Sequence, residues 1–203
     1  MIDALTRTVV PPKPALWRRW TSLPMFSYYN RLLALVLMCN AFVLLAVDFH
    51  ATTVESLADM VLINLSVAIL IRQQYLINTL FWLATRVPRA WPLRVRRSAA
   101  KVYHFGGLHS GAALAATGWF AAMVGVQVAR YLQQPGSVSS AWLWLSSVLL
   151  SLLMMMVIMA LPRVRSRFHN GFERVHRFAG WGALLLFWGL PLLASSEAST
   201  PLL

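Results

Sequence analysis

Long apolar runs alternate along this chain with short clusters of Arg and Lys. Five apolar runs can be drawn, at residues 32–47, 57–83, 102–129, 141–161 and 178–195. A helix needs about 20 apolar residues to cross a bilayer core of roughly 30 Å. The pattern therefore predicts an all-α fold, a polytopic membrane helix bundle with about five transmembrane helices.

The second run is interrupted by Arg72, Gln73 and Gln74. A charge at the centre of a membrane helix is unfavourable unless it is paired or reaches the interface. One interpretation is that Arg72 faces an acidic cofactor group, Asp59 or a polar cavity. The other is that the span ends near Gln74 and that residues 75–83 lie along the interface.

Three segments are expected along the chain. Residues 1–30 form a basic-aromatic arm, broken by prolines, at the cytoplasmic face or interface. Residues 31–196 form the transmembrane domain, and residues 197–203 a short tail. No cleaved signal peptide is expected, because the first apolar run begins only after Arg31.

Charge sets the expected orientation. The chain has 18 Lys and Arg against 6 Asp and Glu, and 59% of its residues are hydrophobic. The cations lie in the arm and in the connections around residues 86–101 and 163–177, which fall on one side of a five-span bundle. Because basic connections are enriched in the cytoplasm, we predict the N-terminus inside and the C-terminus outside. Cations gathered between apolar runs do not indicate nucleic-acid binding.

Four histidines lie at the margins of two apolar runs. His104 and His109 open the third run, whereas His169 and His176 precede the fifth. Imidazoles are unfavourable at membrane depth unless they serve a function, so the predicted topology gathers four candidate ligands at one end of the bundle. About 140° separates His104 from His109 around a helix, so both cannot face one neighbour.

Small residues follow two of these histidines. Gly111, Ala112, Ala113 and Ala116 come after His109, and Ala179, Gly180 and Ala183 come after His176. Such residues would clear a flat slot for a porphyrin between two helices. We therefore predict one haem b held by His109 and His176, with His104 and His169 in reserve. The competing interpretation is that the small residues let helices pack closely and that the histidines are polar anchors.

Charged neighbours supply candidate supporting contacts. Glu173, one turn before His176, is a candidate acceptor for its second ring nitrogen. The candidate partners for haem propionates are Arg174, Arg177, Arg97 and Lys101.

Three stretches carry a resemblance to ferric-reductase-like membrane flavocytochromes. They read IRQQYLINTLF (71–81), PLRVRRSAAKVYHFGGLHSG (92–111) and FHNGFERVHRFAGW (168–181). The chain is most similar to microbial members in which a ferredoxin-reductase-type FAD domain follows the helices. The resemblance implies a haem-bearing helical bundle reduced by a flavin, with His109 and His176 as ligands.

Two departures from that family's pattern shape the expected function. The chain ends soon after the fifth run, so no flavin domain is expected on it. The histidine gaps of five and seven residues suit one haem rather than two stacked across a bilayer. The leading expectation is thus an electron-transfer module, an oxidoreductase subunit of a bacterial cytoplasmic membrane, reduced by a separate flavoprotein or by quinone.

Two other functions remain open. The same histidines with Glu173 would suit non-haem iron in a membrane oxidase or hydroxylase. Alternatively, the chain is a non-catalytic membrane scaffold whose basic loops bind anionic lipid or a partner protein. The single cysteine, Cys39, excludes an internal disulfide and a multi-thiolate metal site.

Overall fold

The computed structural model describes residue 23 and residues 26–48 and 52–198. Within these residues the chain is helical and contains no strand, which confirms the all-α prediction. The helices are α2 (Tyr28–Ala46), α3 (Val54–Leu70), α4 (Gln74–Thr85), α5 (Leu93–Ala99), the 3-10 helix η2 (Ala100–His104), α6 (Gly106–Gln133), α7 (Ser140–Ala160), α8 (Pro162–Arg167) and α9 (His169–Ala198). The predicted arm and tail lie almost entirely outside the described residues.

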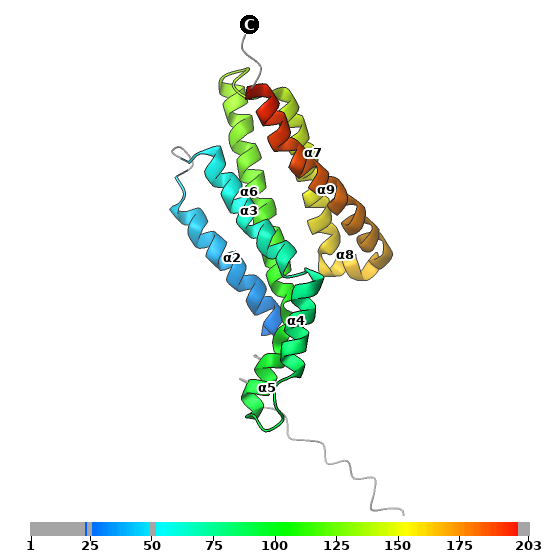
Figure 1. The fold of residues 1–203 in the computed structure, drawn as a ribbon. Coiled ribbons are helices and arrows are strands. Elements are labelled where there is room, and N and C mark those ends of the chain that lie inside the picture. Colours follow the sequence, from blue (N-terminus) through cyan, green and yellow to red (C-terminus); the bar gives the residue numbers. More distant parts are fainter. Residues whose placement is uncertain (1–22, 24–25, 49–51, 199–203) are drawn as a thin grey trace, which may run out of the picture.

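The apolar runs correspond to α2, the α3–α4 pair, α6, α7 and α9 (Figure 1). In the described part of the chain, α2, α6 and α7 are long and apolar enough to cross a membrane. The α3–α4 pair makes a fourth candidate if its two helices, bent by 56° relative to each other, form one broken span. Helix α9 is 30 residues long but begins with the polar sequence HNGFERVHR. A total of five spans therefore remains a prediction.

Local chemistry sets the helix ends. Ser27, Thr53 and Ser139 accept hydrogen bonds from backbone amides in the first turns of α2, α3 and α7. These hydroxyls satisfy donors that a helix N-terminus leaves without a partner. Gly136, in the turn after α6, adopts a φ of 91°, a conformation that glycine tolerates best.

The break between α3 and α4 falls at Arg72. The side-chain oxygen of Gln73 accepts hydrogen bonds from the amides of Tyr75 and Leu76, at 2.6 and 3.1 Å. Gln73 thereby caps a new helix in the middle of the second apolar run. This is close to the predicted boundary at Gln74, and it removes Arg72 from a regular helix interior.

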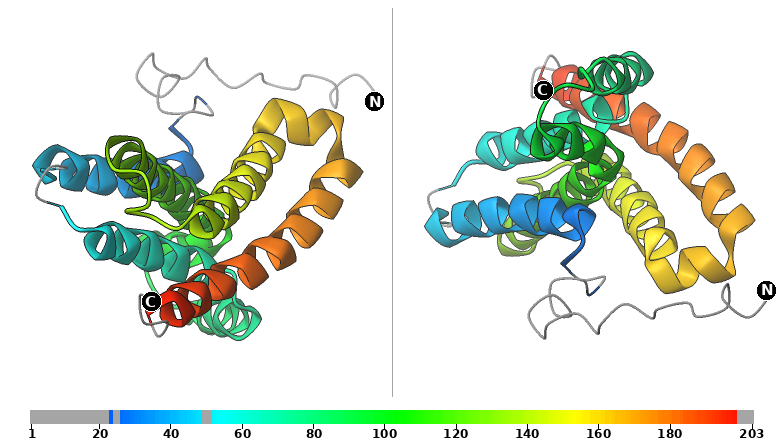
Figure 2. Two further views of the ribbon diagram at one scale, coloured as in Figure 1. Left: turned by 90° about the horizontal axis from the view of Figure 1, so that it is seen from above. Right: turned by 90° about the horizontal axis from the view of Figure 1, so that it is seen from below.

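The bundle consists of two groups of helices. Helix α6 packs along α3 and α2, whereas α9 packs mainly on α7. Figure 2 shows α7, α8 and α9 as a hairpin that diverges from the other three long helices. The main hydrophobic core includes Leu57 of α3, Phe120 of α6, Leu149 of α7 and Ala183 of α9, so it joins the groups over part of their length.

Glycines allow α2 and α6 to approach closely. A Cβ atom at Gly107 would overlap the backbone carbonyl of Tyr29, and one at Gly111 would lie 3.0 Å from the carbonyl oxygen of Leu33. These two residues therefore serve helix packing, the role proposed by the competing interpretation. The prediction that Gly111 helps clear a porphyrin slot is wrong, because the space beside its Cα is filled by α2.

A polar cluster of Asn40, Asn64 and Trp119 joins α2, α3 and α6. The two amides exchange hydrogen bonds of 3.0 and 2.8 Å, and the indole Nε1 of Trp119 donates to Asn40 Oδ1 at 2.8 Å. Their remaining amide hydrogens bond carbonyls of Val36 and Met60. Asn64 is 6% exposed and Trp119 is 4% exposed. We name this group the asparagine–tryptophan cluster.

Candidate functional site

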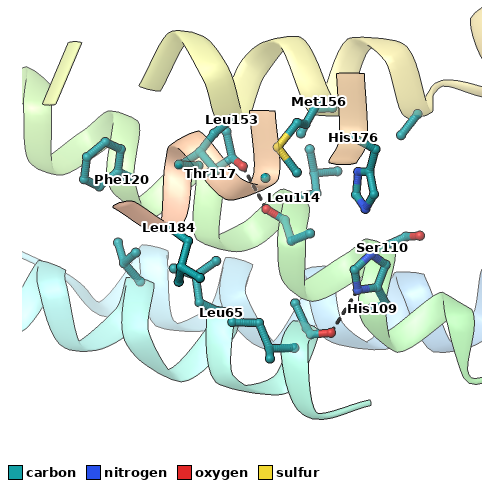
Figure 3. A pocket seen from close by; sticks show the side chains of 18 of the residues that line it. Leu65, His109, Ser110, Leu114, Thr117, Phe120, Leu153, Met156, His176 and Leu184 are labelled. Carbon is teal, nitrogen blue, oxygen red and sulfur yellow. Dashed lines mark hydrogen bonds between the residues drawn. The ribbon is translucent and has the colours of Figure 1, made fainter. Parts of the chain in front are cut away.

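A cavity of about 680 Å³ lies between the two helix groups. Its walls come from α2, α3 and α6 on one side and from α7, α8 and α9 on the other. Figure 3 shows that Leu65, Leu114, Leu153 and Leu184 line one part of it and that His109 and His176 lie together in another. A large apolar cavity with a few polar groups is typical of a ligand site.

His109 of α6 and His176 of α9 face each other across this cavity. Their ring centroids are 6.2 Å apart and their planes meet at 80°. Figure 3 shows the two imidazoles directed toward one another. The structure thus brings together the two histidines that the sequence selected as ligands.

The second nitrogen of His109 is fixed by the end of α3. Its Nδ1–H donates to the backbone carbonyl oxygen of Ala68, 2.9 Å away. A neutral imidazole with its proton on Nδ1 presents an unprotonated Nε2, which is the form that binds a metal. Metal-binding histidines are commonly oriented by such a second hydrogen bond.

His176 has a different environment. Its Nδ1 is buried and has no hydrogen-bond partner among the described residues. The ring instead stacks on Phe172, with centroids 5.4 Å apart and an interplanar angle of 24°. Phe172 is in turn covered by the guanidinium of Arg165, 5.7 Å from the ring centroid.

Of the cations near the imidazoles, Arg72 was one that the sequence singled out for an acidic cofactor group, whereas Arg165 was not. Arg165 of α8 lines the cavity, and Arg72 lies close enough to both imidazoles for its charge to act on each. Arg174 and Arg177 are exposed and do not line the cavity. Lys101 Nζ lies 4.7 Å from the centroid of the Tyr28 ring.

The remaining predicted site residues lie away from the cavity. His104 belongs to η2, outside the regular helix that holds His109. Its ring makes a T-shaped contact with the Tyr28 ring, with centroids 5.8 Å apart. His169 Nε2 lies 3.4 Å from Glu173 Oε1, and both side chains are more than half exposed. Glu173 therefore pairs with His169 and does not serve as the acceptor for His176 Nδ1.

The arrangement of His109 and His176 fits one metal ion between them. Imidazoles bound to opposite sides of a metal, with bonds of about 2.0 Å, hold their ring centroids roughly 6 Å apart. The observed 6.2 Å agrees with that spacing. Across the described residues, no group of three or more His, Cys, Asp and Glu side chains is placed to hold a metal ion. The donor set suits a group that supplies its other ligands itself, as a porphyrin does.

Some contacts at the site were not predicted from the sequence. The Ala68 carbonyl is a backbone atom and leaves no signal in the sequence. Phe172 stands four residues before His176, a spacing that places two side chains on one helix face and could have indicated the stack. Tyr29 and Ser110, whose hydroxyl oxygens lie 2.6 Å apart beside His109, depend on the packing of α2 on α6.

Comparisons with known proteins find two similar proteins but do not assign the chain to a family. Adenylate-forming reductases 03009 and 06235 of Coprinopsis cinerea are 37% and 36% identical to this chain over 167 residues. The matched region covers 80% of this chain but spans only 16% of each relative. No family model matches, and no solved structure gives a significant match. These relatives are fungal, so they lend no support to the expected bacterial membrane; the chain is similar to a minor part of two much longer reductases.

Proposed function

We propose that the chain is a polytopic membrane protein. Large apolar side chains cover the outer faces of its helices, including Phe42 at 69% and Leu45 at 84% exposed on α2, and Trp181 and Leu185 at 67% and 73% exposed on α9. Soluble monomers rarely expose continuous apolar surfaces of this kind. The lipid bilayer is the partner that such faces fit. The basic segments α5 and α8 would then lie on the cytoplasmic side.

We further propose that the chain is a b-type cytochrome module with one haem near that end of the bundle. The observation that carries this proposal is the pair formed by His109 and His176, which come from different helices and face each other at 6.2 Å in an apolar cavity. The ferric-reductase-like resemblance selects the same two residues. The names of both relatives contain the word reductase, which agrees with a redox role.

The haem would supply one-electron transfer between its ferric and ferrous states. His109 would hold it through Nε2, with the ring oriented by the Ala68 carbonyl. Arg165 would place a positive charge at the edge of the cavity, and the leucines of α3, α6 and α7 would exclude water from it. A separate flavoprotein at the basic face, or a quinol from the bilayer, would supply the electrons.

The two other functions have less support. Non-haem iron enzymes hold their metal with at least three protein donors, whereas the described residues bring only two imidazoles together. A non-catalytic scaffold does not account for a pair of facing histidines beside a large cavity. Both functions remain outcomes of the following test.

The test is an absorption spectrum of the full chain, purified in detergent after expression with added haem. We expect a Soret band in the oxidised protein and a sharp α band on reduction. The double variant H109A/H176A should lose both bands, whereas the control H104A/H169A should keep them. A folded wild-type protein without a Soret band would refute the haem proposal; iron without porphyrin absorbance would favour the non-haem alternative, and neither would favour the scaffold.

A further inference from the structure

The Nδ1 atoms of His109 and His176 have different surroundings. His109 donates a hydrogen bond of 2.9 Å to the Ala68 carbonyl, whereas the buried Nδ1 of His176 has no partner in the described part of the chain. The two imidazoles are therefore unequal as ligands.

The position of the proton on each ring makes the two histidines chemically different as ligands. A neutral imidazole carries one proton, and its other nitrogen is the one that binds a metal. When His176 binds through Nε2, the proton must sit on Nδ1, where it is buried without an acceptor. A buried donor without a partner is unfavourable, so ligation by His176 carries a penalty that ligation by His109 does not.

The orientation of His176 is also less directional. The ring is held by stacking on Phe172, and Phe172 by the guanidinium of Arg165. Stacked rings tolerate sliding and tilting more than a hydrogen bond at 2.9 Å does. His176 also belongs to the α7–α9 hairpin, whereas Ala68 and His109 belong to the tightly packed α3 and α6.

The cavity offers space beside His176. Gly180, one turn further along α9, faces the cavity, and a Cβ atom there would have only Met156 Cε within 4 Å, at 3.8 Å. A small ligand on this side would meet the thioether side chain of Met156, which adapts readily to its neighbours, rather than backbone.

Resting on the proposed haem, we propose that His109 is the fixed ligand of the iron and His176 the exchangeable one, so that the reduced protein binds a small π-acceptor ligand such as carbon monoxide in place of His176. The site would then combine electron transfer with ligand binding on one side only, the side that faces α9.

The first experiment adds carbon monoxide to the reduced full chain in detergent. The wild type should show a shifted Soret band, which two firmly bound histidines would prevent. The single variant H176A should retain haem and bind carbon monoxide, whereas H109A should retain at least about tenfold less haem, because removing a ligand weakens binding at least as much as removing the contacts that support it. Size-exclusion profiles of both variants check that each is folded.

A second variant keeps the test decisive if H176A does not fold. Phe172→Leu removes the ring that stacks on His176 and should raise the affinity for carbon monoxide several-fold. The matched control is Phe168→Leu, because Phe168 is exposed and lies under Arg167. A wild-type protein that contains haem but does not bind carbon monoxide, or equal haem loss in H109A and H176A, would overturn this inference while leaving the proposed cytochrome intact. A protein without haem would overturn both.

Discussion

The asparagine–tryptophan cluster and the imidazole pair are two polar groups inside the same apolar bundle, and they are built in opposite ways. In the cluster, the amide hydrogens of both asparagines and the indole N–H all reach acceptors between 2.8 and 3.0 Å away. In the imidazole pair, one ring is hydrogen bonded, whereas the other has a buried nitrogen to which none of the described residues bonds, beside a cavity of about 680 Å³.

The difference separates a packing role from a binding role. Polar groups that satisfy one another hold helices in register and leave nothing for a ligand to bind. A buried polar group without a partner is uncommon in a native protein and calls for an explanation, such as a missing ligand. A similar contrast applies to the helix groups, since α2 and α3 pack closely on α6, whereas α7 and α9 meet this group over only part of their length, beside the cavity.

The largest difference is expected between a methyl group added at the close contact of α2 with α6 and one added beside the cavity. Gly107→Ala places a Cβ on the Tyr29 carbonyl and should greatly reduce the yield of folded protein, because overpacking costs about 1–3 kcal/mol or more where backbone must move. Gly180→Ala, in the open region, should be tolerated. Gly118→Ala is a control, since a Cβ there has nothing within 4 Å. Thermal unfolding in detergent measures all three, and equal melting temperatures would contradict the contrast.

An intermediate effect is expected from removing one hydrogen-bonding side chain of the asparagine–tryptophan cluster. Asn64→Ala removes hydrogen bonds to both Asn40 and the Met60 carbonyl and should lower the free energy of unfolding by about 1–2 kcal/mol. Haem content per folded protein should not change, because the cluster has no role in binding. Ser151→Ala is the control, as this exposed hydroxyl bonds only the Ser147 carbonyl of its own helix. Loss of haem from stably folded Asn64→Ala protein would remove the proposed division of roles.

The smallest effect is expected from a charge at the open site. Arg165→Gln should lower the midpoint potential of the haem, because a nearby cation favours the reduced form, by an amount on the order of 1 kcal/mol. Arg174→Gln should change it much less, since Arg174 does not line the cavity. Redox titration followed at the α band measures both variants, and a larger shift for Arg174→Gln would place the haem elsewhere.

The fold was largely predictable because long apolar runs separated by short polar segments predict long apolar helices. The α7 run was expected at 141–161 and is observed at Ser140–Ala160. The helix that carries His109 begins only at Gly106, because η2 precedes it, and α9 extends back to His169, well before the apolar run. Polar residues can occupy the first turns of a helix, so hydropathy alone does not locate its start.

The site was predictable only in part. Positions at the margins of two apolar runs gave four candidate histidines, and the small residues that follow His109 and His176 selected these two, which the structure brings together. The contacts that support the two rings could not be predicted from the sequence. Ala68 contributes a backbone atom, and Arg165 lines the cavity because of where the short helix α8 lies. The small residues also divided in a way that sequence could not show, since Gly111 faces α2 whereas Gly180 faces the cavity.

The position of the α7–α9 hairpin has a consequence for biogenesis. A nascent chain synthesised only through α6 possesses the closely packed half of the bundle and one imidazole of the pair, that of His109. The second imidazole arrives only when α9 has been synthesised and has folded back along α7. Under the proposed function, haem would therefore be acquired late, after α9 has folded back, and a product truncated before α9 would lack one of the two proposed ligands.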